Sequence, residues 1–169
     1  MKKFSKEERS SWRYFWAHWF AFQMTAVTLN AWKFKYLFHD WYKPWLKMFG
    51  VPYKKIQKYH RTHSKHHIEW LMKNCYYNYS MEKYFDWEAL VIDWECSQYT
   101  KENCPRGAYE EMLNYLENAK KNMPTCNFKY LEYVMNNKMI PIIEKFDIKY
   151  NRFFKKNLVV YFFIFIFAP

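Results

Sequence analysis

Glycine and proline are scarce in this chain. Its 169 residues contain two glycines and six prolines, while 51% are hydrophobic and 24% are aromatic. A many-stranded sheet needs frequent tight turns, and such turns draw heavily on glycine and proline. The composition therefore argues against a sheet and predicts an all-α protein, a single-domain bundle of six or seven helices. A chain of this length can bury a core without disulfides or a structural metal.

Paired cysteines are also lacking. The four cysteines, Cys75, Cys96, Cys104 and Cys126, include no CxxC pair. Their irregular spacing excludes a zinc ribbon and a small disulfide scaffold. We therefore expect free thiols in a reducing, cytoplasmic location.

No uncharged run has the composition of a transmembrane helix. Residues 14–32 are uncharged and about as long as a bilayer requires, but they include the polar His18 and Asn30. We expect a buried first helix instead. It would begin at Ser5 or Lys6, where "SKEE" resembles a capping box, and end near Asn30.

The chain closes on a short apolar run, "LVVYFFIFIFAP", that follows the basic "NRFFKKN". These 12 residues are too few to cross a bilayer as a helix. The interpretation is a helical domain over residues 1–152 and a basic, then apolar tail over residues 153–169. The apolar run could pack on the core, dip into a membrane interface or pair as a strand. No membrane contact is expected for the rest of the chain.

Acidic residues are fewer than basic ones. The chain has 16 Asp and Glu residues against 27 Lys and Arg residues, so its formal charge is +11. This excess indicates an anionic partner, such as a nucleotide, a nucleic acid or an anionic membrane face. The alternative is residue usage typical of an AT-rich genome, because lysine outnumbers arginine and Asn, Tyr, Phe and Ile are plentiful. A sequence-reading nucleic-acid binder would favour arginine.

An adjacent histidine and aspartate occur in "LFHDWYKP". On the helix expected over residues 32–40, His39 and Asp40 would stand about 100° apart and could lean toward one metal ion. Lys43 would share their face and could meet a phosphate beside the metal. The alternative is an ion pair between Asp40 and Lys43 at the end of a helix.

Four of the six histidines lie in "HRTHSKHHIEWL", residues 60–71. If residues 53–74 form one helix, His60, His63 and His67 fall within about 60° of one another, with His66 on the shoulder of that face. Imidazoles at this spacing are natural ligands for zinc, manganese or iron. The alternative is a solvated surface rich in imidazole.

Asp93 is embedded in the apolar run "ALVIDWECS" of an expected helix over residues 81–99. Burying a carboxylate is costly unless it is paired or bound to a cation. Asp93 is therefore a candidate metal ligand in the bundle interior, or one member of an ion pair. His18 by itself is more typical of a hydrogen-bonded core histidine.

Taken in chain order, these residues read H…HD…(H…H)…D. That order resembles the HD-domain superfamily of all-α, metal-dependent phosphohydrolases, and "HDWYK" with the later "HHIE" looks most similar to its binuclear branch. More closely, "LFHDWYKPW", "HRTHSKHHIEW" and "ALVIDWECSQYT" resemble the DUF5662 type of bacterial and phage proteins. The resemblance covers about residues 12–106. Tyr42 and Ser64 depart from it, since members usually carry Ser and Asn at these positions.

The resemblance implies a metal centre. His18, His39, Asp40 and Asp93 would bind a first divalent ion, with Asp40 bridging. A second ion, or the phosphate itself, would be held by His60, His66 and His67. The metal could be Mn, Fe, Mg or Zn. The reaction it implies is hydrolysis of a phosphate ester, such as a nucleotide, with Asp40 and Lys43 as the residues nearest the chemistry.

Two other functions fit the same sequence. One is a non-enzymatic basic helical protein that binds nucleic acid or a protein partner and carries histidines on its surface. The other keeps the metals but uses two irons for oxygen chemistry. Metal content and cofactor chemistry separate the three.

Overall fold

The computed structural model describes residues 3–76, 78–102, 104 and 107–148. Within those residues every regular element is a helix, so the predicted all-α class is confirmed. The one extended pairing there is a single bridge between Phe4 and Lys101. Residues 153–169, expected to form a tail, lie outside the described part of the chain.

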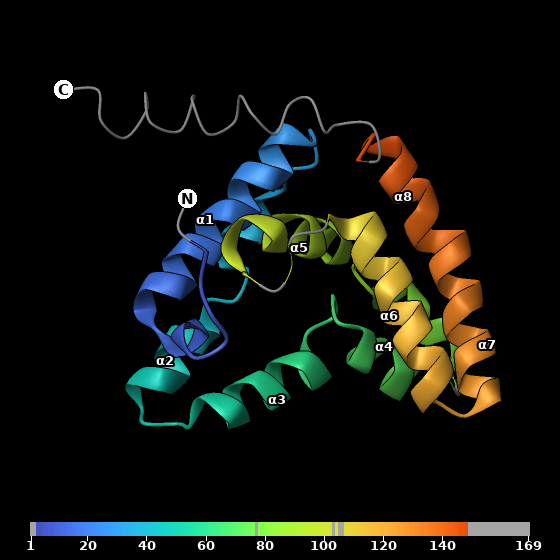
Figure 1. Cartoon of the computed structure of the whole chain (residues 1–169), viewed down its shortest axis with the longest axis horizontal. Helices are drawn as coiled ribbons and strands as arrows, with labels where there is room; N and C mark the ends of the chain where they lie inside the picture. The colour runs from blue at the N-terminus through green and yellow to red at the C-terminus, as the bar shows by residue number, and fades with distance from the viewer. Residues whose placement is uncertain (1–2, 77, 103, 105–106, 149–169) are drawn as a thin grey trace.

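Two helices that are distant in the sequence form the middle of the molecule. α1 (Trp12–Thr28) packs along α5 (Trp87–Thr100), as Figure 1 shows. The Ser11 side chain accepts the N–H of Tyr14 and caps α1, and the Asp86 side chain caps α5 in the same way. α5 is buried on nearly every side, so any polar residue in its middle must find a partner inside the protein.

The chain after α5 covers the other side of that helix. α6 (Ala108–Asn122) leads into α7 (Thr125–Val134), which continues without a break through a π-helical turn, η4 (Met135–Met139), into α8 (Ile140–Lys145). Counting α7 to α8 as one, the described residues hold seven α-helices, within the predicted range. The face that this continuous helix buries against the core repeats about every four residues: Leu131, Met135, Met139 and Ile143.

A set of short elements connects α1 to α5 and carries most of the candidate site. In chain order they are η2 (Phe34–Phe38), α2 (Tyr42–Met48), α3 (Tyr53–His63), α4 (Ile68–Cys75) and η3 (Tyr79–Tyr84). α3 packs against both α2 and α4. These elements lie along the side of the α1–α5 pair where α3 and α4 are labelled in Figure 1.

The predicted first helix starts later than its capping signal suggested. Ser5 and Glu8 do form the reciprocal pair of a capping box: the Ser5 N–H donates to Glu8 Oε2 (2.9 Å) and the Glu8 N–H to Ser5 Oγ (3.4 Å). However, this pair caps only a 3-10 turn, η1 (Glu8–Ser10). Ser11 then adopts extended backbone angles, so α1 begins at Trp12.

The described helices include none that combines the length and apolarity of a membrane span. The uncharged run at residues 14–32 forms α1 and then leaves the helix after Thr28. All four cysteines are free thiols, as predicted.

Candidate metal centre

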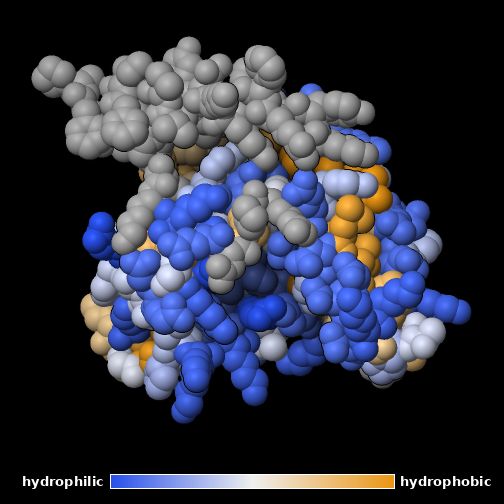
Figure 2. Space-filling view, viewed as in Figure 1, coloured by the Kyte–Doolittle hydropathy of each residue, from blue (hydrophilic) through white to orange (hydrophobic). Residues whose placement is uncertain are grey.

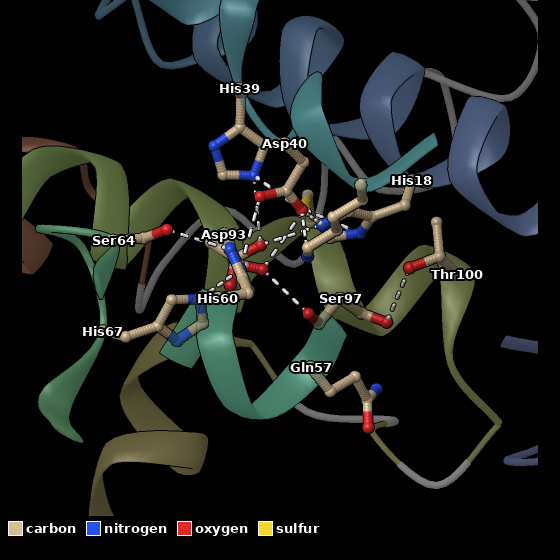
Figure 3. Close-up of polar contacts among 12 residues, drawn as sticks. His18, His39, Asp40, Gln57, His60, Ser64, His67, Asp93, Ser97 and Thr100 are labelled. Carbon is tan, nitrogen blue, oxygen red and sulfur yellow. Dashed lines mark hydrogen bonds and ion pairs between the residues drawn. The ribbon is translucent and has the colours of Figure 1, made fainter. Parts of the chain in front are cut away.

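The two central helices supply one buried histidine and one buried aspartate. His18 of α1 and Asp93 of α5 are 5% and 6% exposed, and His18 Nε2 lies 3.0 Å from Asp93 Oδ1 (Figure 3). His18 is therefore more than a core histidine, because it faces the acidic residue that the apolar run of α5 carries inward.

His39 and Asp40 are brought to the same place by a turn. The prediction that both lie on a helix is wrong: η2 ends at Phe38, and Asp40 has a positive φ of 63°. Aspartate tolerates this left-handed conformation better than most residues, because its short side chain bonds locally. The reversal directs both side chains inward, and the His39 ring stacks flat on Phe22 with ring centroids 3.7 Å apart.

The histidine segment is also split, and the prediction of one helix over residues 53–74 is wrong. α3 ends at His63, and His66 and His67 lie in the connection before α4. His60, in the last turn of α3, is 4% exposed and faces the centre. His63 points away: it is exposed and stacks on Tyr59, with ring centroids 4.2 Å apart. The alternative of a solvated, imidazole-rich surface therefore applies to His63 and not to His60.

The inward-facing residues form overlapping groups whose ligand atoms lie within 4.8 Å of one another. One group is His18, His39 and Asp93; a second is His60, His66 and His67; a third is His39, Asp40 and His66. All seven residues expected as metal ligands are thus brought together, and Figure 3 shows most of them converging.

Asp40 lies between the groups. Its Oδ2 is 3.9 Å from His18 Nε2 and 3.6 Å from His39 Nε2, whereas its Oδ1 is 3.3 Å from His60 Nε2. The two carboxylate oxygens therefore face different sets of imidazoles. On the histidine side, His67 Nε2 lies 2.5 Å from His60 Nε2.

Several polar atoms at this centre are buried without a hydrogen-bond partner. They are His39 Nε2, Asp40 Oδ1 and His66 Nε2. Leaving such atoms unsatisfied costs about 1 to 3 kcal/mol each, so their concentration in one place needs an explanation. All three are atoms that bind metals in proteins, and a cation at this point would satisfy them together.

Four histidines of the centre are held neutral by burial, which lowers their pKa. Burial lowers the pKa of His66 to about 4 and that of His67 to about 2. Burial also lowers the pKa of His18 and His60. Neutral imidazole is the form that binds a metal ion.

The two aspartates, by contrast, are held ionised. Burial opposes this for Asp40, but the neighbouring His39 and the ammonium of Lys43 help to hold its pKa well below the ordinary value. Burial also opposes the ionisation of Asp93, but His18 at 3.0 Å and His39 at 3.6 Å from its Oδ1 outweigh burial and keep the pKa low. The centre therefore presents neutral nitrogen and anionic oxygen donors near neutral pH.

Lys43 and Asp40 form the ion pair that the sequence offered as an alternative to a phosphate contact. Both residues belong to a turn and the start of α2 rather than to the end of a helix. The lysine also lines the cavity beside the centre, so the ion pair does not remove it from the surface that a ligand would meet.

Tyr42 and Ser64 orient His60, a role that the sequence did not reveal. The Tyr42 hydroxyl and Ser64 Oγ both contact His60 Nδ1, the latter at 3.0 Å, and the two hydroxyls lie 2.9 Å apart. Bonding at Nδ1 turns Nε2 toward the centre, as outer partners of metal-binding histidines commonly do. These are the two positions at which the chain departs from the DUF5662 pattern, which was the available signal.

A cavity of about 320 Å³ lies against the centre. His18, His60, His67 and Asp93 form part of its wall. Figure 2 shows a hydrophilic hollow near the middle of the face viewed. Arg61 and Glu69 also line the cavity and form an ion pair with each other at 2.5 Å. The centre is therefore buried on the core side and reachable from the cavity.

Comparison of the chain with protein-family models, curated proteins and solved structures found no match.

Proposed function

We propose that this protein is a metal-dependent hydrolase of a phosphate ester. One observation carries the proposal: buried nitrogen and oxygen donors, several without any hydrogen-bond partner, converge around Asp40 and border a cavity. Such a group is costly to assemble for stability alone, because every member must leave water. A strongly perturbed, convergent set of titratable residues beside a cavity is typical of an active site.

The donors divide into two sets that share Asp40. His18, His39 and Asp93 would hold one ion with Asp40, and His60, His66 and His67 would hold a second. This mixture of imidazole and carboxylate suits Mn, Fe or Zn, and Mg on the side that has more oxygen. When bound, divalent ions at such a site lower the pKa of a coordinated water and neutralise charge on phosphoryl oxygens.

The remaining residues hold these donors in place and prepare the cavity for an anion. Phe22 covers the flat face of the His39 ring and keeps water from it. Lys43 neutralises one carboxylate oxygen of Asp40 while it lines the cavity, where its ammonium could also contact a phosphoryl oxygen. Lys43 in the cavity wall favours an anionic substrate, because dioxygen is uncharged and needs no cation there.

Metal analysis of the purified protein tests the first half of the proposal. We expect one or two equivalents of a divalent metal in the unmodified protein and none in a His39→Ala/Asp40→Ala variant. His63→Ala, which alters a histidine of the same segment outside the centre, is the matched control and should keep its metal. An unmodified protein that holds no metal after growth with Mn, Fe and Zn would end the proposal.

Phosphate release tests the second half. We expect the metal-loaded protein, but not the double variant, to release phosphate from at least one member of a panel of nucleotides and other phosphate esters. Oxygen consumption by a di-iron form without phosphate release would support oxygen chemistry instead. Salt-dependent binding to mixed-sequence DNA that the double variant retains would support the basic binding protein.

A further inference from the structure

Arg9 is a half-buried cation on the cavity wall and forms no ion pair with a described residue. Its Nε and Nη2 atoms are buried and make no hydrogen bond, and no carboxylate pairs with it among the described residues. A guanidinium withdrawn from water is normally paired, because the desolvation of an isolated charge is costly. Arg9 lines the same cavity as the metal centre, so a ligand there could supply the missing acceptor.

The backbone around Arg9 is held from two sides. The Phe4 N–H donates to the Thr100 carbonyl (2.9 Å), and the Glu102 N–H donates to the Phe4 carbonyl (3.2 Å). On the other side, the Lys47 ammonium donates to the Ser10 carbonyl. These bonds anchor the first residues of the described chain against the end of α5 and the end of α2, with Arg9 between them.

Lys101, at the end of α5, is a second cation of the cavity wall that lacks an ion pair. Its ammonium donates to Ser97 Oγ (2.6 Å), and that hydroxyl donates to the Asp93 carbonyl (2.8 Å). Among the described residues no carboxylate forms an ion pair with it. Burial opposes the charge, but the neighbouring Tyr14 and Asp93 outweigh burial and raise the pKa of Lys101. The ammonium is thus positioned by the helix that supplies Asp93.

The other cations of the cavity wall are already neutralised. Lys43 pairs with Asp40, and Arg61 pairs with Glu69. Glu111 also lines the cavity, and it contacts the Cys104 thiol rather than a cation. Arg9 and Lys101 therefore differ from these cations, because neither forms an ion pair with a described carboxylate.

We propose that Arg9 and Lys101 form an anion-binding subsite beside the metal centre, which takes a second anionic group of the ligand, a phosphate or a carboxylate. The metal centre would hold the reacting phosphate, and the subsite would select esters that carry another negative group. This assignment of substrate class rests on the proposed hydrolase function, whereas anion binding by Arg9 and Lys101 does not require the metals.

The experiment therefore uses metal-free, full-length protein and inorganic phosphate as the probe. Calorimetric titration is expected to show phosphate binding by the unmodified protein, weakened at least tenfold by Arg9→Gln and by Lys101→Gln. Arg13→Gln and Lys54→Gln remove exposed cations and should leave the affinity within twofold. Two results would overturn the proposed subsite. One is unchanged phosphate affinity in each of the two variants, Arg9→Gln and Lys101→Gln. The other is no binding by the unmodified protein at millimolar phosphate.

Thermal melting tests whether Arg9 has a purely structural role. Without phosphate, Arg9→Met should melt no lower than the unmodified protein, because it removes an unpaired, half-buried charge. Phosphate should raise the melting temperature of the unmodified protein and not that of Arg9→Met. A variant that melts several degrees lower yet still binds phosphate would show that Arg9 serves the fold. Metal content, measured separately, distinguishes failure of the subsite from failure of the metal centre.

Discussion

The candidate centre has two parts that are built differently. His18 and Asp93 project from the middle of α1 and α5, which pack against each other. His39, Asp40, His66 and His67 lie in short connections, where the backbone changes direction. The helical part is positioned by core packing, whereas the part formed by connections depends on individual turns.

The connections are nevertheless held firmly. The His67 N–H donates to the Ser64 carbonyl (3.1 Å), and the Asp86 N–H donates to the Lys65 carbonyl (2.7 Å), which ties the histidine turn to the start of α5. The histidine turn is thus tied to α5, the helix that carries Asp93. The segment before His39 is instead bonded by Trp19 and Gln23 of α1. A helix can thus position side chains that it does not carry itself. Substitutions can disturb the two parts of the centre separately.

The largest expected effect comes from the helical part. Asp93→Asn keeps the shape of the side chain but removes the charge, so we expect metal affinity to fall at least about 100-fold because a ligand itself is altered. Asp86→Ser, on the same helix, replaces one capping residue by another and should retain the metal. Competition titration with a chelator measures both. Equal affinities in the two variants would remove Asp93 from the centre.

A smaller effect is expected within the histidine segment. His60→Ala removes an inward imidazole and should weaken metal binding or lower its stoichiometry by one, with a loss of about tenfold or more in affinity. His63→Ala removes the outward imidazole and should change affinity by less than twofold. A reversed order would mean that α3 continues as the sequence suggested and that its periodic face binds the metal.

The turn at Asp40 can be examined apart from its charge. Asp40→Asn and Asp40→Ala both remove the carboxylate, and both should lose the metal. They differ in backbone preference, because asparagine tolerates the φ of 63° and alanine pays about 1 kcal/mol for it. We expect the alanine variant to melt a few degrees below the asparagine variant in metal-free protein. Identical melting curves would show that the left-handed turn is not required.

The smallest expected effect is that of mild acid on metal affinity. A histidine with an ordinary pKa of 6.5 would begin to lose its metal to protons just below that pH. Here burial lowers the pKa of His66 to about 4 and that of His67 to about 2, so proton uptake by these rings in the folded metal-free site is displaced to lower pH. We expect affinity to change by less than threefold between pH 7.5 and pH 5.5, measured by chelator competition. A tenfold loss per pH unit below 6.5 would contradict the buried, neutral arrangement.

The fold class, and the residues that converge at the candidate centre, could be read from the sequence. The shortage of glycine and proline pointed to helices, and the order of His18, His39-Asp40 and Asp93 pointed to a common centre. Helical periodicity failed locally, because it assumed that residues 53–74 continue as one helix and therefore favoured His63. The order of residues along the chain was the better guide, since it made no assumption about where a helix ends.

Other features could not be foreseen because they depend on contacts between distant segments. Nothing near Arg9 in the sequence marks it as lining a cavity that Lys101 also lines. The bridge that joins the two segments pairs Phe4 with Lys101. The contacts of Tyr42 with His60 and with Ser64 likewise join residues that lie 18 and 22 positions apart in the sequence.

By itself, then, the sequence determined that the chain is helical and which side chains are suited to bind a metal, because composition and residue type act locally. Only the tertiary structure decided which nitrogen and oxygen atoms face one another, that Asp40 lies between the two sets, and that two cations remain unpaired on the cavity wall. The physical reason is that burial and charge depend on neighbours in space. Those neighbours were set by the packing of α1 on α5 and by the turns that hydrogen bonds tie to these two helices.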